Sequence, residues 1–393
     1  MTNTTSELPA PSPLFESTTL GSLALPNRLV MAPLTRNRAT SDGVPTPIMA
    51  THYADRATAG LIIAEATTPN AVGQTYPNIP GLHTPAQVDG WRTVTDAVRA
   101  AGGRMFVQLQ HGGRVGHPDN SGFTPVAPSA VALPEEIHTA AGRVPSVVPR
   151  EMTPDDIRST AADFAAAARR AVEAGFEGVE VHSANGHLLH QFLSKNTNLR
   201  TDGYGGSVEN RIRFTVEVVR AVAEAIGPER VGVRVSPGVT VNGIEEGDTD
   251  ALYPALVSAL AGLADPTGPS GASLGTHLAY LHVIFADPDQ PLFHQIREAW
   301  PSTLIANPDL GWGLPLPADG GRAAGERLLA AGADLISFGR GFLANPDLVE
   351  RLRTGAPLNP VRDRYLMYTG GETGYNDYPV LAARAPREAV PAA

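Results

Sequence analysis

Eight short apolar runs recur along the chain, and stretches of helical character separate them. The runs cover residues 29–34, 61–66, 104–109, 178–182, 231–235, 280–284, 303–306 and 335–338. Most are apolar at nearly every position, as expected of parallel strands that are covered on both faces. Strands that alternate with helices predict a parallel sheet. Eight repeats favour a closed (β/α)8 barrel over an open, doubly wound sheet.

Glycine occupies the same place in several of these repeats. Gly102, Gly175, Gly227 and Gly332 each follow an alanine-rich helical stretch and precede an apolar run. A glycine just past a helix adopts the left-handed conformation of a C-cap without steric cost. These positions therefore support repeated returns from helix to strand.

One segment interrupts the alternation of apolar runs and helical stretches. Residues 122–150, rich in proline, valine and alanine, stand between the third run and a helix start at Thr153-Pro-Asp-Asp. An insertion after a barrel strand is most simply a lid over the mouth of the barrel. We expect one barrel domain over residues 14–379, with flexible tails at 1–13 and 380–393.

Composition excludes several classes of protein. The chain has 393 residues, a length compatible with one large barrel, and it has no cysteine, which excludes disulfides, thiolate zinc sites and iron–sulfur clusters. The net charge of -10 argues against a nucleic-acid partner. No apolar run approaches the roughly 18 residues that span a bilayer. The N-terminus shows no signal-peptide pattern, so we expect a cytoplasmic protein with no membrane partner.

The densest group of polar residues follows the fourth apolar run, in His-Ser-Ala-Asn-Gly-His-Leu-Leu-His at 182–190. In a barrel, the C-terminal end of a strand is where active sites are built. His182, His187 and His190 could also bind a metal ion, but Glu180 is the one carboxylate nearby, so we expect no metal site. A metal-assisted hydrolase or lyase on the same barrel stays open as the alternative function.

Seven motifs, in order along residues 14–379, together resemble the Old Yellow Enzyme family. They cover residues 26–36, 60–67, 107–111, 182–211, 233–237, 338–347 and 370–379. The resemblance implies an FMN-dependent enzyme that reduces the activated C=C bond of small electron-poor alkenes, namely enones and nitroalkenes, with nitro compounds and nitrate esters as further candidates. NAD(P)H would reduce FMN first, and flavin N5 would then pass a hydride to the substrate in a ping-pong cycle.

The same resemblance assigns cofactor-binding residues to several strand ends. Arg234 would lie beside the N1 and O2 edge of the flavin, where a cation stabilises the reduced form. The Thr35 hydroxyl would bond flavin O4, and the Gln108 amide would bond the O2 and N3 edge. The Gly339 backbone and the Arg340 guanidinium would bind the phosphate. The predicted FMN contacts also include Pro33, Leu34 and Ala66.

His182 and Asn185 are the predicted substrate ligands. In the resembled mechanism both donate a hydrogen bond to the substrate oxygen while negative charge grows on it, and each such donor contributes roughly 3 kcal/mol. His187 stands where the family has a tyrosine proton donor. Histidine is the stronger acid but is mostly deprotonated at neutral pH. His187 could donate the proton, water could donate it, or His187 could only shape the pocket.

Further positions concern the substrate and the phosphate. Gln110 replaces an aromatic residue common in the family, which predicts a more polar or roomier pocket. Tyr76 and Tyr375 match family positions that line the mouth. Residues 307–317 replace the usual glycine-rich turn after the seventh run, so half of the phosphate cradle stays undefined. The sequence decides neither between NADPH and NADH nor between a monomer and a homodimer.

Overall fold

The eight predicted strands close into one parallel barrel in the computed structural model, which describes residues 12–265, 273–311 and 315–381. β14 pairs with β3, so the ring is complete and the predicted (β/α)8 fold is confirmed. The first strand ends three residues earlier than predicted, so that Pro33 and Leu34 follow it. In chain order the strands are β3 (Leu29–Met31), β4 (Leu61–Thr67), β5 (Met105–Leu109), β10 (Gly178–Ser183), β11 (Val231–Val235), β12 (Tyr280–Ala286), β13 (Thr303–Pro308) and β14 (Leu335–Phe338).

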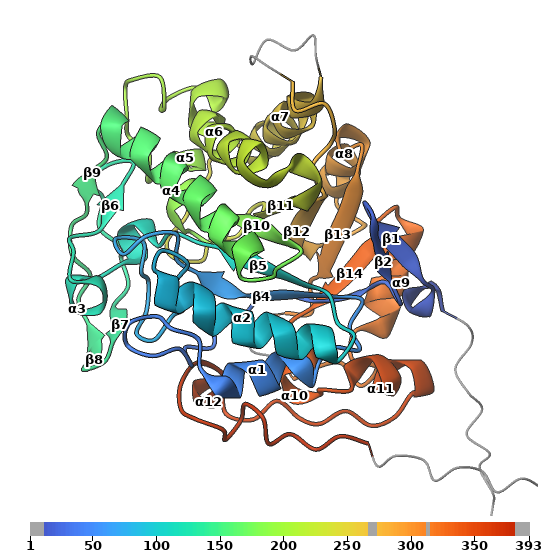
Figure 1. Cartoon of the computed structure of the whole chain (residues 1–393). Helices are drawn as coiled ribbons and strands as arrows, with labels where there is room; N and C mark the ends of the chain where they lie inside the picture. The colour runs from blue at the N-terminus through green and yellow to red at the C-terminus, as the bar shows by residue number, and fades with distance from the viewer. Residues whose placement is uncertain (1–11, 266–272, 312–314, 382–393) are drawn as a thin grey trace, which may run out of the picture.

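Helices surround the barrel (Figure 1). The longer ones are α1 (Pro47–Ala54), α2 (Pro85–Ala100), α4 (Pro154–Glu173), α6 (Val208–Ile226), α7 (Thr249–Ala261), α8 (Pro291–Ala299) and α9 (Arg322–Ala330). The shorter ones include α3 (Pro118–Ser121), α5 (Leu188–Leu193), α10 (Arg340–Ala344), α11 (Leu348–Thr354) and α12 (Arg364–Tyr368). All four predicted cap glycines have positive φ. The predicted helix start at Thr153 is also confirmed, because Thr153 and Asp156 cap α4 reciprocally.

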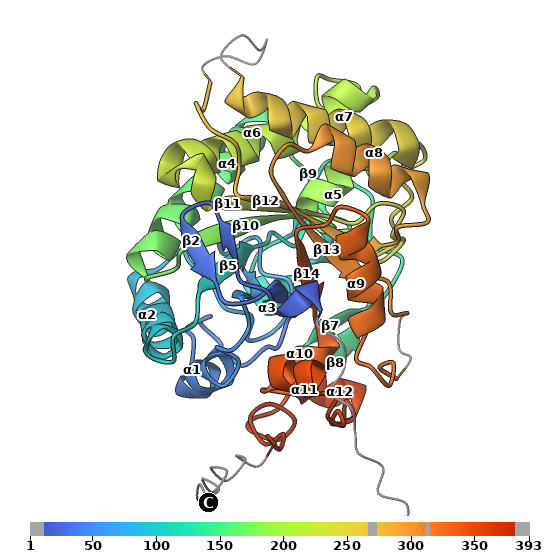
Figure 2. The ribbon, with the colours of Figure 1, turned by 90° about the vertical axis from the view of Figure 1, so that its right-hand side faces the viewer.

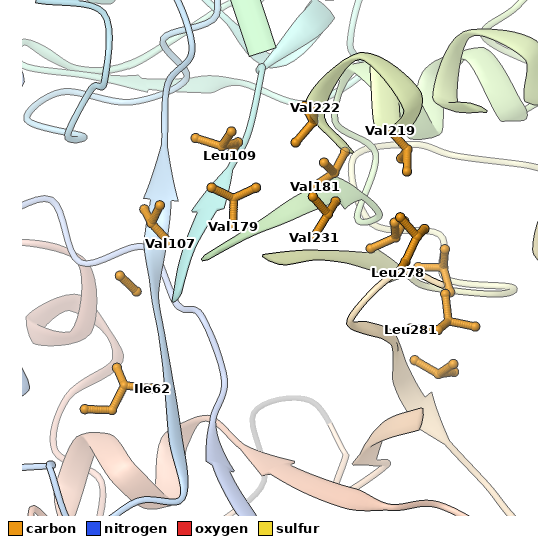
Figure 3. Close-up of a cluster of buried hydrophobic side chains, with 14 of the residues drawn as sticks. Ile62, Val107, Leu109, Val179, Val181, Val219, Val222, Val231, Leu278 and Leu281 are labelled. Atoms are coloured by element: carbon orange, nitrogen blue, oxygen red, sulfur yellow. The ribbon is translucent and has the colours of Figure 1, made fainter. Parts of the chain in front are cut away.

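The largest core lies between the strands and the helices. In Figure 3, Val181 of β10 and Val231 of β11 lie near Val219 and Val222 of α6, and Val179 of β10 lies on the side toward β5. All five side chains are completely buried. Burying such a side chain stabilises the fold by about 1.5–3 kcal/mol. This outer layer, together with a filled interior, explains why the strands are apolar at nearly every position.

The N-terminal end of the barrel is closed. The hairpin of β1 (Thr18–Leu20) and β2 (Leu23–Leu25) lies at this end (Figure 2). Leu20 and Leu25 belong to the same buried cluster as Phe106 and Tyr280, which start their barrel strands or lie next to the start. The opposite, C-terminal end of the barrel is therefore the one available for ligands.

Gly178 is required by the packing inside this closed end. A Cβ at this position would lie 2.3 Å from the backbone oxygen of Arg230 and 2.6 Å from the Phe106 ring. We expect Gly178→Ala to lower the free energy of unfolding by about 1–3 kcal/mol, measured by urea denaturation. Gly203→Ala is the matched control, because its nearest neighbouring atom is 4.0 Å away. Equal losses in the two variants would contradict this account.

The insertion after β5 has its own strands. β6 (Val126–Ala127) pairs with β9 (Arg150–Glu151), and β7 (Ile137–Thr139) forms a hairpin with β8 (Gly142–Val144). It lies on the side of the molecule away from β1 and β2 (Figure 1). Its function as a lid stays a prediction.

Two other sequence expectations concern the ends of the chain and membranes. Most of the predicted tails, residues 1–11 and 382–393, lies outside the described residues. Within the described ranges, no helix combines the length and the apolar character that crossing a bilayer requires.

Candidate active site

A cavity of about 780 Å³ opens at the C-terminal ends of the barrel strands. Its charged lining groups are Arg234, Arg340 and Arg362, and no carboxylate among the described residues joins them. A cavity of this size is typical of a cofactor or small-molecule site. Its positive lining suits a ligand that carries negative charge.

Six of the predicted residues meet at this cavity. They come from the segment after β3, from the ends of β10 and β11, and from the end of β14. These are Pro33, Leu34, Asn185, Arg234, Gly339 and Arg340. The other predicted residues do not line this cavity: Thr35, Ala66, Tyr76, Gln108, Gln110, His182, His187 and Tyr375.

The end of the cavity next to β14 carries the two predicted phosphate ligands. Gly339 precedes α10, and Arg340 begins it. Arg340 Nη2 donates to the Gly311 backbone oxygen at 2.6 Å. A Cβ on Gly339 would lie 3.0 Å from Leu34 Cδ1, so glycine leaves room there. Residues 312–314 of the unusual loop lie outside the described residues, so this half of the cradle is not tested.

Arg234 extends from β11 to the cavity wall. Its Nη1 donates to the Pro33 backbone oxygen at 3.3 Å. Its buried Nε has no hydrogen-bond partner among the described residues. Burial lowers the pKa of Arg234, and nearby Glu180 opposes this shift, so the guanidinium stays protonated. A buried cation whose Nε–H is not hydrogen-bonded within the described residues fits the edge of a flavin that carries hydrogen-bond acceptors.

A layer of polar side chains crosses the barrel interior beside Arg234. Glu180 Oε1 accepts from Gln108 Nε2 at 2.8 Å, and Glu180 Oε2 lies 2.8 Å from His282 Nδ1. His282 Nε2 in turn lies 2.8 Å from Ser337 Oγ. Burial opposes ionisation of Glu180, but its contacts with His282 and Gln108, and the charge of Arg234, hold its pKa below the ordinary value. Glu180 is therefore a buried carboxylate ion.

Asn185 is held in position by its backbone. Asn185 and Gly186 both have positive φ, at 53° and 74°, a conformation that asparagine tolerates better than most residues. The Asn185 backbone N–H donates to Ser236 Oγ at 2.9 Å, and Asn242 Nδ2 donates to the Asn185 backbone oxygen at 2.8 Å. The side-chain Oδ1 has no partner among the described residues. The side-chain carbonyl oxygen is thus available to a ligand.

His182 and His187 form a hydrogen-bonded pair next to Asn185. His182 Nε2 lies 3.2 Å from His187 Nδ1, and His182 Nδ1 lies 3.1 Å from Gln108 Nε2. Burial, with the neighbouring His187 and Arg234, lowers the pKa of His182 well below its ordinary value. Burial also lowers the pKa of His187 to about 4. Both rings are therefore neutral at pH 7.

His190 is turned away from this pair. Its Nε2 lies 2.8 Å from Glu246 Oε1, and its Nδ1 accepts from the Gly186 backbone N–H at 3.1 Å. The three imidazoles needed for a metal site therefore do not converge. In the part of the chain that the structure describes, no group of three histidines or carboxylates could hold a metal ion. The metal-assisted alternative has no geometric support.

The expectation that Tyr375 lines the mouth is corrected by the structure. Tyr375 is completely buried, and its ring stacks on His52 with 3.9 Å between ring centroids. The guanidinium groups of Arg36 and Arg38 lie 4.7 Å from its centroid. Tyr368, in the same C-terminal segment, lines the cavity instead. The motif around Tyr375 showed where the segment is, but not which tyrosine faces the barrel.

Two other predicted substrate residues do not line the cavity. Gln110 is buried, and its Nε2 donates to Thr75 Oγ1 at 3.1 Å. Tyr76 is half-buried and packs against a small apolar cluster that includes Val115. Phe285, which the sequence analysis missed, lines the cavity with φ of 52°. A shift of register in β12 places it there, and no sequence signal indicated that shift.

The fold and the site define a flavin-dependent oxidoreductase on a (β/α)8 barrel. The chain belongs to the NADH:flavin oxidoreductase / NADH oxidase family, whose sequence profile matches residues 13–359. It is 43% identical over 374 residues to a probable flavin mononucleotide-dependent alkene reductase of Leishmania infantum, covering 92% of this chain and 96% of the relative. It is also 39% identical over 375 residues to 12-oxophytodienoate reductase 1 of Oryza sativa subsp. japonica, covering 94% and 93%.

Solved structures agree. An old yellow enzyme homologue from Zymomonas mobilis matches with a TM-score of 0.85 and 40% identity, covering 94% of this chain and all of that chain. Morphinone reductase in complex with tetrahydroNAD matches with a TM-score of 0.84 and 42% identity, covering 95% and 99%. The resemblance to the Old Yellow Enzyme family is thereby confirmed, as are FMN as the cofactor, NAD(P)H as the reductant and the ene-reductase class.

Proposed function

We propose that the enzyme reduces small electron-poor alkenes such as enones and nitroalkenes, and that His182 and Asn185 bind the carbonyl or nitro oxygen of the substrate. One observation carries the proposal: Asn185 shares a carboxylate-free cavity with Arg234, and its side-chain Oδ1 has no hydrogen-bond partner among the described residues. When bound, FMN takes up a hydride from NAD(P)H and delivers it to the alkene. Nitro compounds and nitrate esters are secondary candidates.

The chain's own groups fit the cofactor at three places. Arg234 offers an unpartnered Nε to an electron-rich edge. Gln108 uses its amide nitrogen for Glu180 and His182, which leaves its carbonyl oxygen as an acceptor. Gly339 and Arg340 would hold the phosphate at the far end of the cavity. Pro33, Leu34, Thr35 and Ala66 would complete the contacts.

Substrate activation follows from two neutral donors. A donor aimed at the substrate oxygen stabilises the negative charge that grows on it more than it stabilises the uncharged ground state. His182 is almost completely buried, so its N–H acts in surroundings of low polarity where this effect is large. The polarised alkene then accepts hydride at its β-carbon.

The test is a substrate panel run without oxygen. Cyclohexenone, an N-substituted maleimide and a nitroalkene are each mixed with the FMN-loaded enzyme and NADPH or NADH. We expect nicotinamide oxidation that matches formation of the saturated product. Nicotinamide oxidation that occurs with oxygen alone, with no saturated product from any acceptor, would contradict the proposal.

The pH profile shows whether His187 acts as an acid. Because the pKa of His187 is lowered to about 4, the ring is already almost entirely neutral at pH 5.5. Only the protonated imidazolium form of His187 donates a proton readily, and this form is lost below the pH range of the experiment. We expect the rate of enone reduction in stopped-flow experiments to be flat from pH 5.5 to 9, with water as the proton source. A rate that falls as pH rises through 6 to 7 would instead show that His187 is the acid.

A further inference from the structure

We infer that the substrate oxygen replaces His187 as the acceptor of the proton on His182 Nε2. This inference rests on the proposed function. The cavity reaches Asn185 but not His182, whose residue surface is 2% exposed. His187 Nδ1 covers His182 Nε2 at 3.2 Å. For His182 and Asn185 to bind one oxygen together, the His187 ring must therefore move away from His182 Nε2.

The direction of this hydrogen bond is set from inside the barrel. Glu180, a carboxylate ion, can only accept, so the Gln108 group 2.8 Å from it is the amide nitrogen. The same amide nitrogen lies 3.1 Å from His182 Nδ1 and directs its second N–H at that atom, so His182 Nδ1 is a hydrogen-bond acceptor. His182 is neutral, so its one proton is on Nε2 and points to His187. Glu180 thus acts as a positioning residue that makes His182 a donor.

Moving the His187 ring breaks two interactions, the hydrogen bond with His182 and a hydrogen bond with the Ala184 backbone. The ring accepts from His182 at Nδ1, so its own proton is on Nε2, an atom without a partner among the described residues. His187 is the N-cap of α5, but its side chain makes no capping hydrogen bond. The helix therefore does not depend on the position of the ring. A neutral hydrogen bond contributes about 1 kcal/mol net.

This arrangement favours oxygens that carry negative charge. A ligand must break the bond between the two histidines before it binds His182. A charge-assisted hydrogen bond is roughly twice as strong as a neutral one. A phenolate, or an oxygen that gains charge during reduction, therefore offsets the loss more fully than a neutral carbonyl does. His187 weakens the binding of every such ligand by the same amount, and a charged oxygen, which forms the stronger hydrogen bond, still binds with a net gain.

The inference is tested by ligand binding. FMN-loaded parent, His187→Phe, His182→Ala and the double variant are titrated with para-chlorophenol, and binding is followed by the change in flavin absorbance. We expect about fivefold tighter binding in His187→Phe, the ratio that corresponds to about 1 kcal/mol. In the His182→Ala background the same substitution should give no gain. Equal or weaker binding in His187→Phe would overturn the inference.

A second measurement uses the parent enzyme, so its result does not depend on how the phenylalanine of His187→Phe packs in the pocket. In the FMN-loaded parent labelled with ¹⁵N-histidine, adding para-chlorophenol should shift the His187 Nδ1 resonance and leave the proton on His182 Nε2. An unchanged His187 resonance at saturating phenol would overturn the exchange. The Asn185→Ala variant distinguishes a failure of this inference from a failure of the proposed function. If neither Asn185→Ala nor His182→Ala weakens phenol binding, the proposed function itself is wrong.

Discussion

Replacing either His182 or Asn185 with alanine should slow alkene reduction about a hundredfold or more and leave the FMN content unchanged. Each substitution removes one donor from the oxygen on which charge develops, and a single such donor contributes a factor of this size. Neither residue belongs to the phosphate end of the cavity, so cofactor binding should persist. The measurement is the stopped-flow rate at which an enone reoxidises the reduced enzyme.

His294→Ala is the matched control for the histidine variant. His294 is an exposed histidine on α8, and its ring contacts the Pro288 backbone oxygen. Its removal should leave the rate unchanged. A double His182→Ala/Asn185→Ala variant that reduces enones at the parental rate would refute the assignment of the substrate site.

Replacing Arg234 with methionine should weaken FMN binding or slow its reduction by NADPH, by roughly tenfold to a hundredfold. Methionine keeps much of the side-chain volume but removes the buried cation at the cavity wall. A hydrogen bond that involves a charged group contributes about 1.5–3 kcal/mol, and Arg234 Nε is free to form one. Flavin content after gel filtration and the anaerobic rate of bleaching by NADPH measure the two effects.

Arg327→Met is the control for loss of a positive charge. Arg327 is on α9 and pairs with Asp289, and both side chains are largely exposed. An exposed pair contributes little, so flavin content and reduction rate should not change. Full flavin content together with an unchanged rate in Arg234→Met would remove Arg234 from the cofactor site.

The barrel could be predicted because its strands are apolar on both faces and four of its helices are followed closely by a glycine of positive φ. β11 and β14 begin and end where the apolar runs do. The predicted strand ends are wrong where the apolar pattern and the backbone hydrogen bonds of the sheet end at different residues. The run at 29–34 continues past Met31, although Pro33 has no N–H for a ladder. The run at 280–284 stops before Phe285, which β12 includes through an irregular register.

Site residues were predictable where they directly follow a strand. Asn185 and Arg340 reach the cavity as expected. Tyr368 was missed, because spacing within a C-terminal segment does not show which side chain faces inward. The contact between His182 and His187 depends on the rotamers of two buried rings. The role of Glu180 depends on the register between β5 and β10, which a single sequence does not contain.

The most direct test of the account is a pair of half-reactions on the purified enzyme without oxygen. NADPH or NADH should bleach the flavin absorbance, and one equivalent of 2-cyclohexenone should restore it with formation of cyclohexanone. We expect both steps to use the same cavity, so one preparation tests the cofactor site and the substrate site together. Bleached enzyme that oxygen reoxidises but that no enone, maleimide or nitroalkene reoxidises would contradict the assignment of the cavity as an alkene-reducing site.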